Sequence, residues 1–215
     1  MADLSRDPAF LATTFIVIDF EGTTPRGHPP EPIEVAALAL RTDGQAWTET
    51  GRFEALICPP PHAPVTGADI SQTGITAAMV AGQPGARAVL ADLDRHISRP
   101  PCLLVAHHAP TEAGFLYRYR DACPGLAGTG LLDTIRIARQ VMPGLPAYNL
   151  DELVARLAIP LPAGRHRAMP DVQITARLFT TLLGREPGLW ADLRALTTQC
   201  GLTARASQPV QEALF

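Results

Sequence analysis

The chain has 215 residues, 47% of them hydrophobic and 18% charged, with a net charge of −3. These values are typical of a globular protein with a full core, and the weak charge excludes an overall attraction to nucleic acid. No apolar stretch reaches the length of a membrane span, and the N-terminus lacks the layout of a signal peptide. The four cysteines form no CxxC pair, which disfavours zinc ribbons and thioredoxin-like chemistry and favours reduced thiols in a cytoplasm.

The predicted elements follow the order strand, strand, strand, helix, strand, helix, strand, helices. Apolar runs predict strands at 15–20, 33–40, about 53–57, 103–106 and 131–132. A short helix is expected to open at 74–76, and amphipathic or capped patterns predict longer helices over 86–97, 112–119, 134–141, 150–159, 171–183 and 188–199. This order predicts an α/β fold in which a mixed central sheet of about five strands carries helices on both faces.

Composition also divides the chain. We expect residues 1–13 to be an N-terminal extension, 14–200 to be one domain, and 201–215 to be a flexible tail. Active sites of such folds lie at the carboxyl ends of the central strands.

Two acids stand at the end of the first predicted strand. Alternation along the strand places Asp19 and Glu21 on one face and Phe20 on the other. Neighbouring carboxylates repel each other unless a cation lies between them, so this pair indicates a metal site. The alternative is that the strand ends at Ile18 and that both acids are solvated loop residues.

Two further segments place polar groups where apolar patterns end. Glu112 lies in the first turn of a predicted helix, and Asp171 opens another, with His166 in the loop before it. Either acid could instead serve only to favour the helix dipole. Taken together with Asp19 and Glu21, they form a set of four carboxylates with one histidine.

Such a set has a clear chemical meaning. Oxygen ligands favour Mg²⁺ or Mn²⁺ over zinc. Carboxylates from several segments can hold two such ions roughly 3.5–4 Å apart, which suits in-line attack on phosphorus. A histidine that titrates near neutral pH is suited to deprotonate the attacking water.

These motifs resemble those of the DEDDh 3′→5′ exonucleases, a family that includes the proofreading epsilon subunit of bacterial DNA polymerase III. The resemblance covers roughly 14–183 and rests on Ile18-Asp19-Phe20-Glu21, on Val105-Ala106-His107-His108-Ala109 with Glu112, and on His166-Arg167-Ala168 with Asp171. It implies a ribonuclease H-like fold, two bound Mg²⁺ or Mn²⁺ ions, and an exonuclease domain over 14–200.

The resemblance also implies residue roles. Asp19 would bridge both ions, Glu21 and Asp171 would hold one of them, and Glu112 would help to hold the other. His166 would be the general base. Contacts with the terminal nucleotide would come from the backbone around Gly22 and Thr23 and from the side chain of His107.

The chain departs from the family pattern at several positions. Glu112 stands where the family usually has Asp, and the extra methylene moves the carboxylate outward by about 1.5 Å, the length of one bond. His108 stands where Asn is usual, and Thr73 where His is frequent. The Glu112 exchange could lower activity or shift the metal preference.

The chain ends in Gln211-Glu212-Ala213-Leu214-Phe215. This segment resembles the motif by which bacterial replication proteins bind the sliding clamp, with Gln211, Leu214 and Phe215 as its fixed positions. An exposed Leu-Phe pair on a polar tail needs a pocket to enter. The alternatives are that the pair folds back onto the last helix or that the match is fortuitous.

The leading hypothesis is a metal-dependent 3′→5′ exonuclease that releases nucleoside monophosphates from single-stranded DNA ends during replication or repair, with a sliding clamp or a polymerase subunit as partner. Two alternatives stay open. One is an exoribonuclease of the same fold, because contacts with the 2′-hydroxyl cannot be placed from sequence. The other is a weakly active, clamp-tethered interaction module, which Glu112 motivates.

Overall fold

The computed structural model describes residues 3–97, 101–161, 166–186 and 188–202. Its centre is strand β1 (Thr14–Gly22), whose residues 15–18 are almost completely inaccessible to solvent. β1 pairs antiparallel with β2 (Pro32–Thr42) and parallel with β4 (Cys102–Ala106). A strand that is covered on both faces needs an apolar run rather than simple alternation, and the sequence supplies that run.

One six-stranded sheet runs through the described residues in the order β3-β2-β1-β4-β5-β6. Its remaining strands are β3 (Trp47–Leu56), β5 (Leu131–Asp133) and β6 (Gly201–Leu202). The predicted mixed sheet is confirmed, with one strand more than expected. Because β6 is only two residues long, it has no periodicity that a sequence pattern could reveal.

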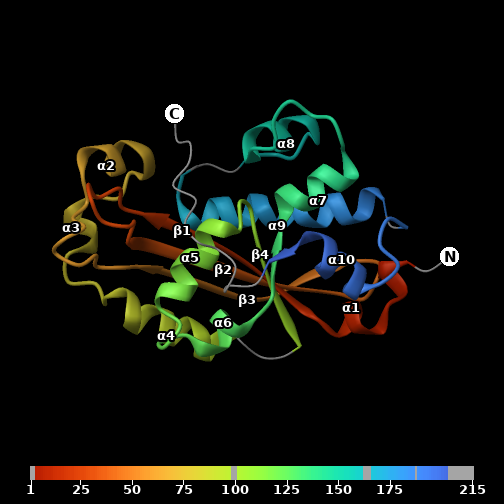
Figure 1. Cartoon of the computed structure of the whole chain (residues 1–215), viewed down its shortest axis with the longest axis horizontal. Helices are drawn as coiled ribbons and strands as arrows, with labels where there is room; N and C mark the ends of the chain where they lie inside the picture. The colour runs from red at the N-terminus through yellow and green to blue at the C-terminus, as the bar shows by residue number, and fades with distance from the viewer. Residues whose placement is uncertain (1–2, 98–100, 162–165, 187, 203–215) are drawn as a thin grey trace.

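Helices cover both faces of the sheet (Figure 1). On one face Phe15 and Val17 of β1 pack with helices α1, α7, α8, α9 and α10. On the other face Ile16, Ile18 and Phe20 pack with α4, α5 and α6. The bounds of these helices are Pro8–Ala12 (α1), Ala86–Ile97 (α4), Pro110–Arg118 (α5), Pro124–Gly128 (α6), Thr134–Val141 (α7), Leu150–Arg156 (α8), Ala168–Arg185 (α9) and Leu193–Cys200 (α10).

Three short helices complete the described fold: the 3₁₀ helix η1 (Leu4–Arg6), α2 (Gly67–Thr73) and α3 (Ala77–Val80). The sequence prediction missed η1, α1, α2 and α6. It placed the start of the last helix near residue 188, whereas α10 begins at Leu193, where the Asp192 side chain accepts a hydrogen bond from the backbone N–H of Ala195 at 2.7 Å. No helix among the described ranges combines the length and the apolar character that crossing a bilayer requires.

Apolar side chains from the described N-terminal residues pack into the core. Phe10 of α1 is buried, and its ring centroid lies 5.0 Å from that of Phe15 in β1. The Asp7 carboxylate accepts a hydrogen bond of 2.7 Å from the backbone N–H of Leu193 at the start of α10. These contacts join residues 3–13 to β1 and α10, while the expected division into an N-terminal extension at 1–13, a domain at 14–200 and a tail at 201–215 stays a prediction.

Candidate metal centre

The predicted acid pair lies at the carboxyl end of β1, on the face that α9 covers. Side-chain alternation puts Asp19 and Glu21 on the same face as Phe15 and Val17. Asp171 lies in the first turn of α9, which packs on this face. One ligand oxygen from each of Asp19, Glu21 and Asp171 lies within 4.8 Å of the other two. The fold therefore brings together three of the four predicted acids.

Glu112 reaches the same end of the sheet from the other side. Helix α5 follows β4, and Pro110 at its first position fixes the helical start, so that Glu112 falls in the first turn. Its side chain is buried, with 3% of the residue exposed, and its Oε2 has no hydrogen-bond partner. A buried carboxylate oxygen without a donor is costly, and a hard divalent cation is a fitting partner for it.

Electrostatics support the same interpretation. Burial, followed by the charges of Glu112, Glu21 and Asp171, raises the pKa of Asp19 well above its usual value. Burial, reinforced by Asp133 and Glu21, raises the pKa of Glu112 to about 8. Clustered acids suppress each other's ionisation, and a bound cation relieves this repulsion, so the cluster favours cations as ligands. The residues present therefore fit one or more divalent ions.

The raised pKa of Glu112 makes the stability of the metal-free protein depend on pH. Its pKa is about 8 in the folded chain against an ordinary 4.5, so the folded state holds an extra proton between these values. The free energy of unfolding should therefore fall as pH rises through this window, by an amount on the order of 4 kcal/mol. Urea unfolding in chelator from about pH 5 to about pH 9 measures this slope.

Two variants sharpen the pH experiment. Glu112→Gln should remove most of the slope, because its neutral amide does not titrate. Glu49→Gln, on the exposed part of β3, should keep the wild-type slope. A slope that Glu112→Gln leaves unchanged would assign the titration to another group.

Two histidines that flank the acids have left-handed backbones. His166, the predicted general base, is exposed and has φ of 62° immediately before α9. His108 has φ of 64° before α5, and its Nδ1 lies 3.0 Å from Oγ1 of Thr111. Non-glycine residues rarely adopt this region, and such conformations concentrate at functional sites.

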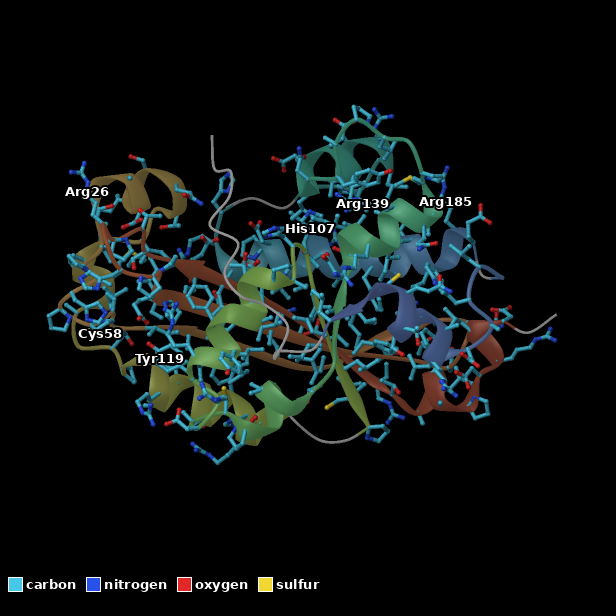
Figure 2. The ribbon with its side chains drawn as sticks, viewed as in Figure 1. Arg26, Cys58, His107, Tyr119, Arg139 and Arg185 are labelled. Atoms are coloured by element: carbon cyan, nitrogen blue, oxygen red, sulfur yellow. The ribbon has the colours of Figure 1, made fainter. Side chains whose placement is uncertain are left out.

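His107 is held by the first residue of helix α7. Its Nδ1 lies 2.8 Å from Oγ1 of Thr134, and that hydroxyl also contacts the carbonyl oxygen of Ala106 at 3.3 Å. Since a hydroxyl donates only one hydrogen, donation to Ala106 leaves Thr134 to accept a hydrogen bond from the Nδ1–H of His107. Figure 2 shows His107 toward the α7 and α9 side of the molecule, away from Tyr119.

The loop after β1 is fixed from two sides. Gly22 packs closely on α5, because a Cβ at this position would lie 3.1 Å from Cζ of Phe115 and the ring would have to shift. Thr23 is fully buried, and its N–H donates to the carbonyl of Glu31 at 2.8 Å. The next residue, Thr24, donates from its N–H and hydroxyl to the Asp69 carboxylate, at 3.1 and 2.7 Å. Thr23 thus has a clear role in supporting the loop, whereas its predicted contact with a nucleotide stays a prediction.

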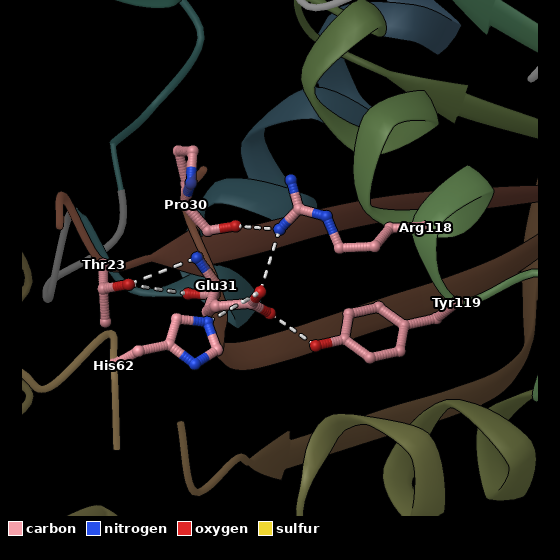
Figure 3. A network of polar contacts seen from close by, with 6 residues as sticks. All are labelled: Thr23, Pro30, Glu31, His62, Arg118 and Tyr119. Atoms are coloured by element: carbon pink, nitrogen blue, oxygen red, sulfur yellow. Dashed lines mark hydrogen bonds and ion pairs between the residues drawn. The ribbon is translucent and has the colours of Figure 1, made fainter. Parts of the chain in front are cut away.

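A buried carboxylate network joins this loop to α5. Glu31 is only 5% exposed and accepts hydrogen bonds from Arg118 and from the hydroxyl of Tyr119, while His62 Nε2 lies 3.8 Å from its Oε1 (Figure 3). The hydroxyl of Thr23 accepts from the Glu31 N–H at 3.2 Å. Since α5 carries Glu112 and β1 carries Asp19 and Glu21, this network fixes one half of the acid cluster relative to the other.

Removing one donor from this network should destabilise the protein. Burial and the Glu31 carboxylate raise the pKa of Tyr119, so its hydroxyl keeps its proton and donates it to Glu31. Tyr119→Phe leaves that carboxylate oxygen short of a donor, and we expect a loss of about 1–3 kcal/mol in urea unfolding. Tyr117→Phe, on the exposed face of the same helix, should change stability by less than about 0.5 kcal/mol. Equal effects of the two substitutions would contradict a structural role for the network.

Sequence reasoning gave no site role to three buried acids near the site: Glu31, Glu34 and Asp133. Asp133, which ends β5, caps α7 by accepting from the N–H of Ile135 at 2.9 Å. The position of Asp133 and Thr134 after an apolar pair was the available signal. The predicted clamp-binding residues Gln211, Leu214 and Phe215 lie outside the described residues.

Comparison with known proteins agrees with this geometry. A family model described as Exonuclease matches residues 16–179 of the chain. A DNA polymerase III subunit epsilon from Aquifex aeolicus is 33% identical over 172 residues, which are 79% of this chain and 80% of that protein. A DNA polymerase III subunit epsilon-like protein from Rhodobacter capsulatus is 34% identical over 190 residues, but the match spans only 25% of its length.

Solved structures share the fold. The structure of Exonuclease X in complex with 5′ overhanging duplex DNA superposes with a TM-score of 0.59 at 25% identity, covering 79% of this chain and 91% of that one. The nuclease domain of 3′hExo, a DEDDh family member, bound to rAMP, gives a TM-score of 0.67 at 20% identity, with 81% and 93% covered. The ribonuclease H-like arrangement expected from the motifs is thereby confirmed.

Proposed function

Because this chain belongs to the exonuclease family and is a 3′→5′ exonuclease, we propose that it removes nucleoside monophosphates from the 3′ ends of single-stranded DNA. The observation that carries the proposal is the convergence of Asp19, Glu21 and Asp171 within 4.8 Å, beside the unpartnered Oε2 of Glu112. Such a cluster binds divalent cations, and a phosphodiester end is the substrate on which they act.

The four acids Asp19, Glu21, Glu112 and Asp171 would hold two Mg²⁺ or Mn²⁺ ions. When bound, these ions supply Lewis-acid activation of the phosphodiester. Glu112 is buried in the first turn of α5, so the longer side chain in place of Asp is compatible with ligation of a metal ion. This supports an active enzyme over a module with a disabled site.

His166 would act as the general base. Its exposed imidazole, in the segment directly before α9 and Asp171, can accept a proton from the attacking water. His107 would contact the terminal nucleotide, and its contact with Thr134 would hold the imidazole ring in place. The backbone at Gly22 would lie beside the same nucleotide.

The protein would contact only a few nucleotides of its substrate. Only 6% of residues are aromatic, so stacking along many bases is not supported, and contacts limited to the 3′ end fit better. The relatives named as DNA polymerase III subunits favour DNA and a role in replication or repair, in a cytoplasm. RNA is the alternative substrate.

Digestion of labelled oligonucleotides tests the function. With Mg²⁺ or Mn²⁺, a 3′-label should leave as a mononucleotide at once, while a 5′-label should yield a shortening ladder. Chelator should stop both, and DNA should be cut faster than RNA of the same sequence. Faster cutting of RNA would make the chain an exoribonuclease, and no release at millimolar metal would refute the proposed activity.

We also propose a sliding clamp as a partner, bound through Gln211, Leu214 and Phe215. The proposal is supported by the sequence motif and by the names of the polymerase-subunit relatives. Removing the last five residues should weaken association with a bacterial sliding clamp at least tenfold while leaving digestion of free oligonucleotides unchanged. Unchanged association would refute this partner.

A further inference from the structure

Glu34 is a buried acid that the proposed mechanism does not use. It lies on β2 directly opposite Glu21 of β1, and only 1% of it is exposed. Carboxylates that face each other on neighbouring strands repel, and a buried charge needs a compensating partner. Glu34 therefore requires a cation, and the structure supplies one from a segment 133 residues away.

That cation is Arg167, the residue after the proposed base. Its Nε lies 3.1 and 2.9 Å from the two carboxylate oxygens of Glu34, and its Nη2 donates to Oε1 as well. This fork geometry is specific to arginine, because lysine offers only a point charge.

The same carboxylate also begins helix α9. The N–H of Ala168, the first residue of the helix, donates to Oε2 of Glu34 at 2.9 Å. Arg167 occupies the N-cap position and makes no side-chain cap of its own. Glu34 thus supplies, from a neighbouring strand, the acceptor and negative charge that a helix start favours.

Two proposed functional groups flank this contact. His166 precedes Arg167 and has the uncommon left-handed φ of 62°, and Asp171 follows three residues after Ala168. A left-handed histidine persists only where its neighbours fix it. The contact with Glu34 fixes the residue next to it.

We propose that Glu34 and Arg167 are positioning residues, which together set the place of the His166 base and of the Asp171 ligand relative to β1. This inference rests on the proposed function. Neither side chain touches the substrate in this role, so their loss should reduce turnover without weakening the binding of the oligonucleotide.

The test uses Glu34→Gln and Arg167→Lys in the full chain. Both should lower kcat at least tenfold and leave KM for a single-stranded oligonucleotide within about twofold. The matched control is Arg52→Lys, since Arg52 makes the same fork with Glu49 on the exposed part of β3, at 3.0 and 3.1 Å. This control should keep wild-type kcat and KM.

A second readout needs neither metal nor activity. In chelator, NMR amide exchange at Ala168 should be at least tenfold faster in both variants, while the amides of β1 keep their protection. Parallel acceleration at β1 would mean global destabilisation and would overturn the positioning role. If Glu34→Gln does not fold, Arg167→Lys alone carries the test.

The outcomes separate this inference from the proposed function. A wild-type chain that digests no oligonucleotide would refute the function, while Ala168 exchange would still report on the contact. An active wild type whose Arg167→Lys variant has unchanged kcat or unchanged Ala168 exchange would overturn the positioning role and leave the function standing.

Discussion

Asp19→Ala is expected to remove both metal binding and exonuclease activity. Asp19 is the acid on which the charges of Glu112, Glu21 and Asp171 all act, so it lies at the centre of the cluster. Losing it should lower kcat by at least ~10³-fold, because in the proposed function activation of the phosphodiester depends on ions that this carboxylate would hold. Oligonucleotide digestion and a calorimetric Mn²⁺ titration measure the two effects.

Removing the charge of Asp19 should stabilise the metal-free protein although it abolishes activity. Because its surroundings raise the pKa of Asp19, the free energy of unfolding of the metal-free protein falls as the pH rises above the pKa of an ordinary carboxylate. Asp19→Asn, a neutral side chain of nearly the same shape, should therefore raise Tm in chelator while it abolishes activity. A raised Tm would show that the loss of activity does not come from unfolding.

Asp43→Asn is the matched control for this experiment. Asp43 is exposed in the turn between β2 and β3, where it accepts hydrogen bonds from backbone N–H groups of Gln45 and Ala46. It should keep wild-type activity and Mn²⁺ binding. Undiminished Mn²⁺ binding in Asp19→Ala would contradict the metal centre itself.

His166→Ala is expected to lose most turnover and to keep metal binding. The imidazole contributes a proton acceptor and no carboxylate oxygen, so the acid cluster stays intact. Loss of a general base lowers kcat by about 10²–10⁴-fold.

His96→Ala provides the control for this substitution. His96 is an exposed histidine on α4, whose Nδ1 lies 2.8 Å from the carbonyl oxygen of Asp92. Its loss should leave turnover unchanged. Full activity in His166→Ala would refute the general-base assignment, and lost Mn²⁺ binding would mean that His166 acts on the metal site instead.

Strand β3 shows why some boundaries could not be predicted. The apolar signal began at residue 53, but the strand begins at Trp47, because its first half is a polar, exposed edge. Backbone hydrogen bonds to β2 place Thr48 opposite Arg41, whatever the polarity of these side chains. Pairing with a neighbour, and not local composition, made this segment a strand.

The predicted capping box at the start of α8 is confirmed only in part. Asn149 caps the helix by accepting from the N–H of Glu152 at 2.9 Å. The Glu152 side chain pairs with Arg156, one turn along the helix. The local pattern predicted the start of the helix correctly. The Glu152 side chain forms a salt bridge with Arg156 and is therefore not the second half of a capping box.

The sequence by itself determined the positions of the four acids along their elements. A buried strand needs an apolar run, and a first helical turn favours a carboxylate, so Asp19, Glu21, Glu112 and Asp171 were recognisable from local patterns. The family motifs then indicated that these acids act together. Local chemistry alone could not give their distances.

Only the tertiary structure decided what holds those acids in place. Glu34 meets Arg167, and Glu31 meets Arg118 and Tyr119, across 133, 87 and 88 residues of chain. In the sequence around each of these residues, no local pattern indicates which partner it will bind. Their pairing follows from the packing of the helices against the sheet, because a charge that is buried in that packing must find its partner there.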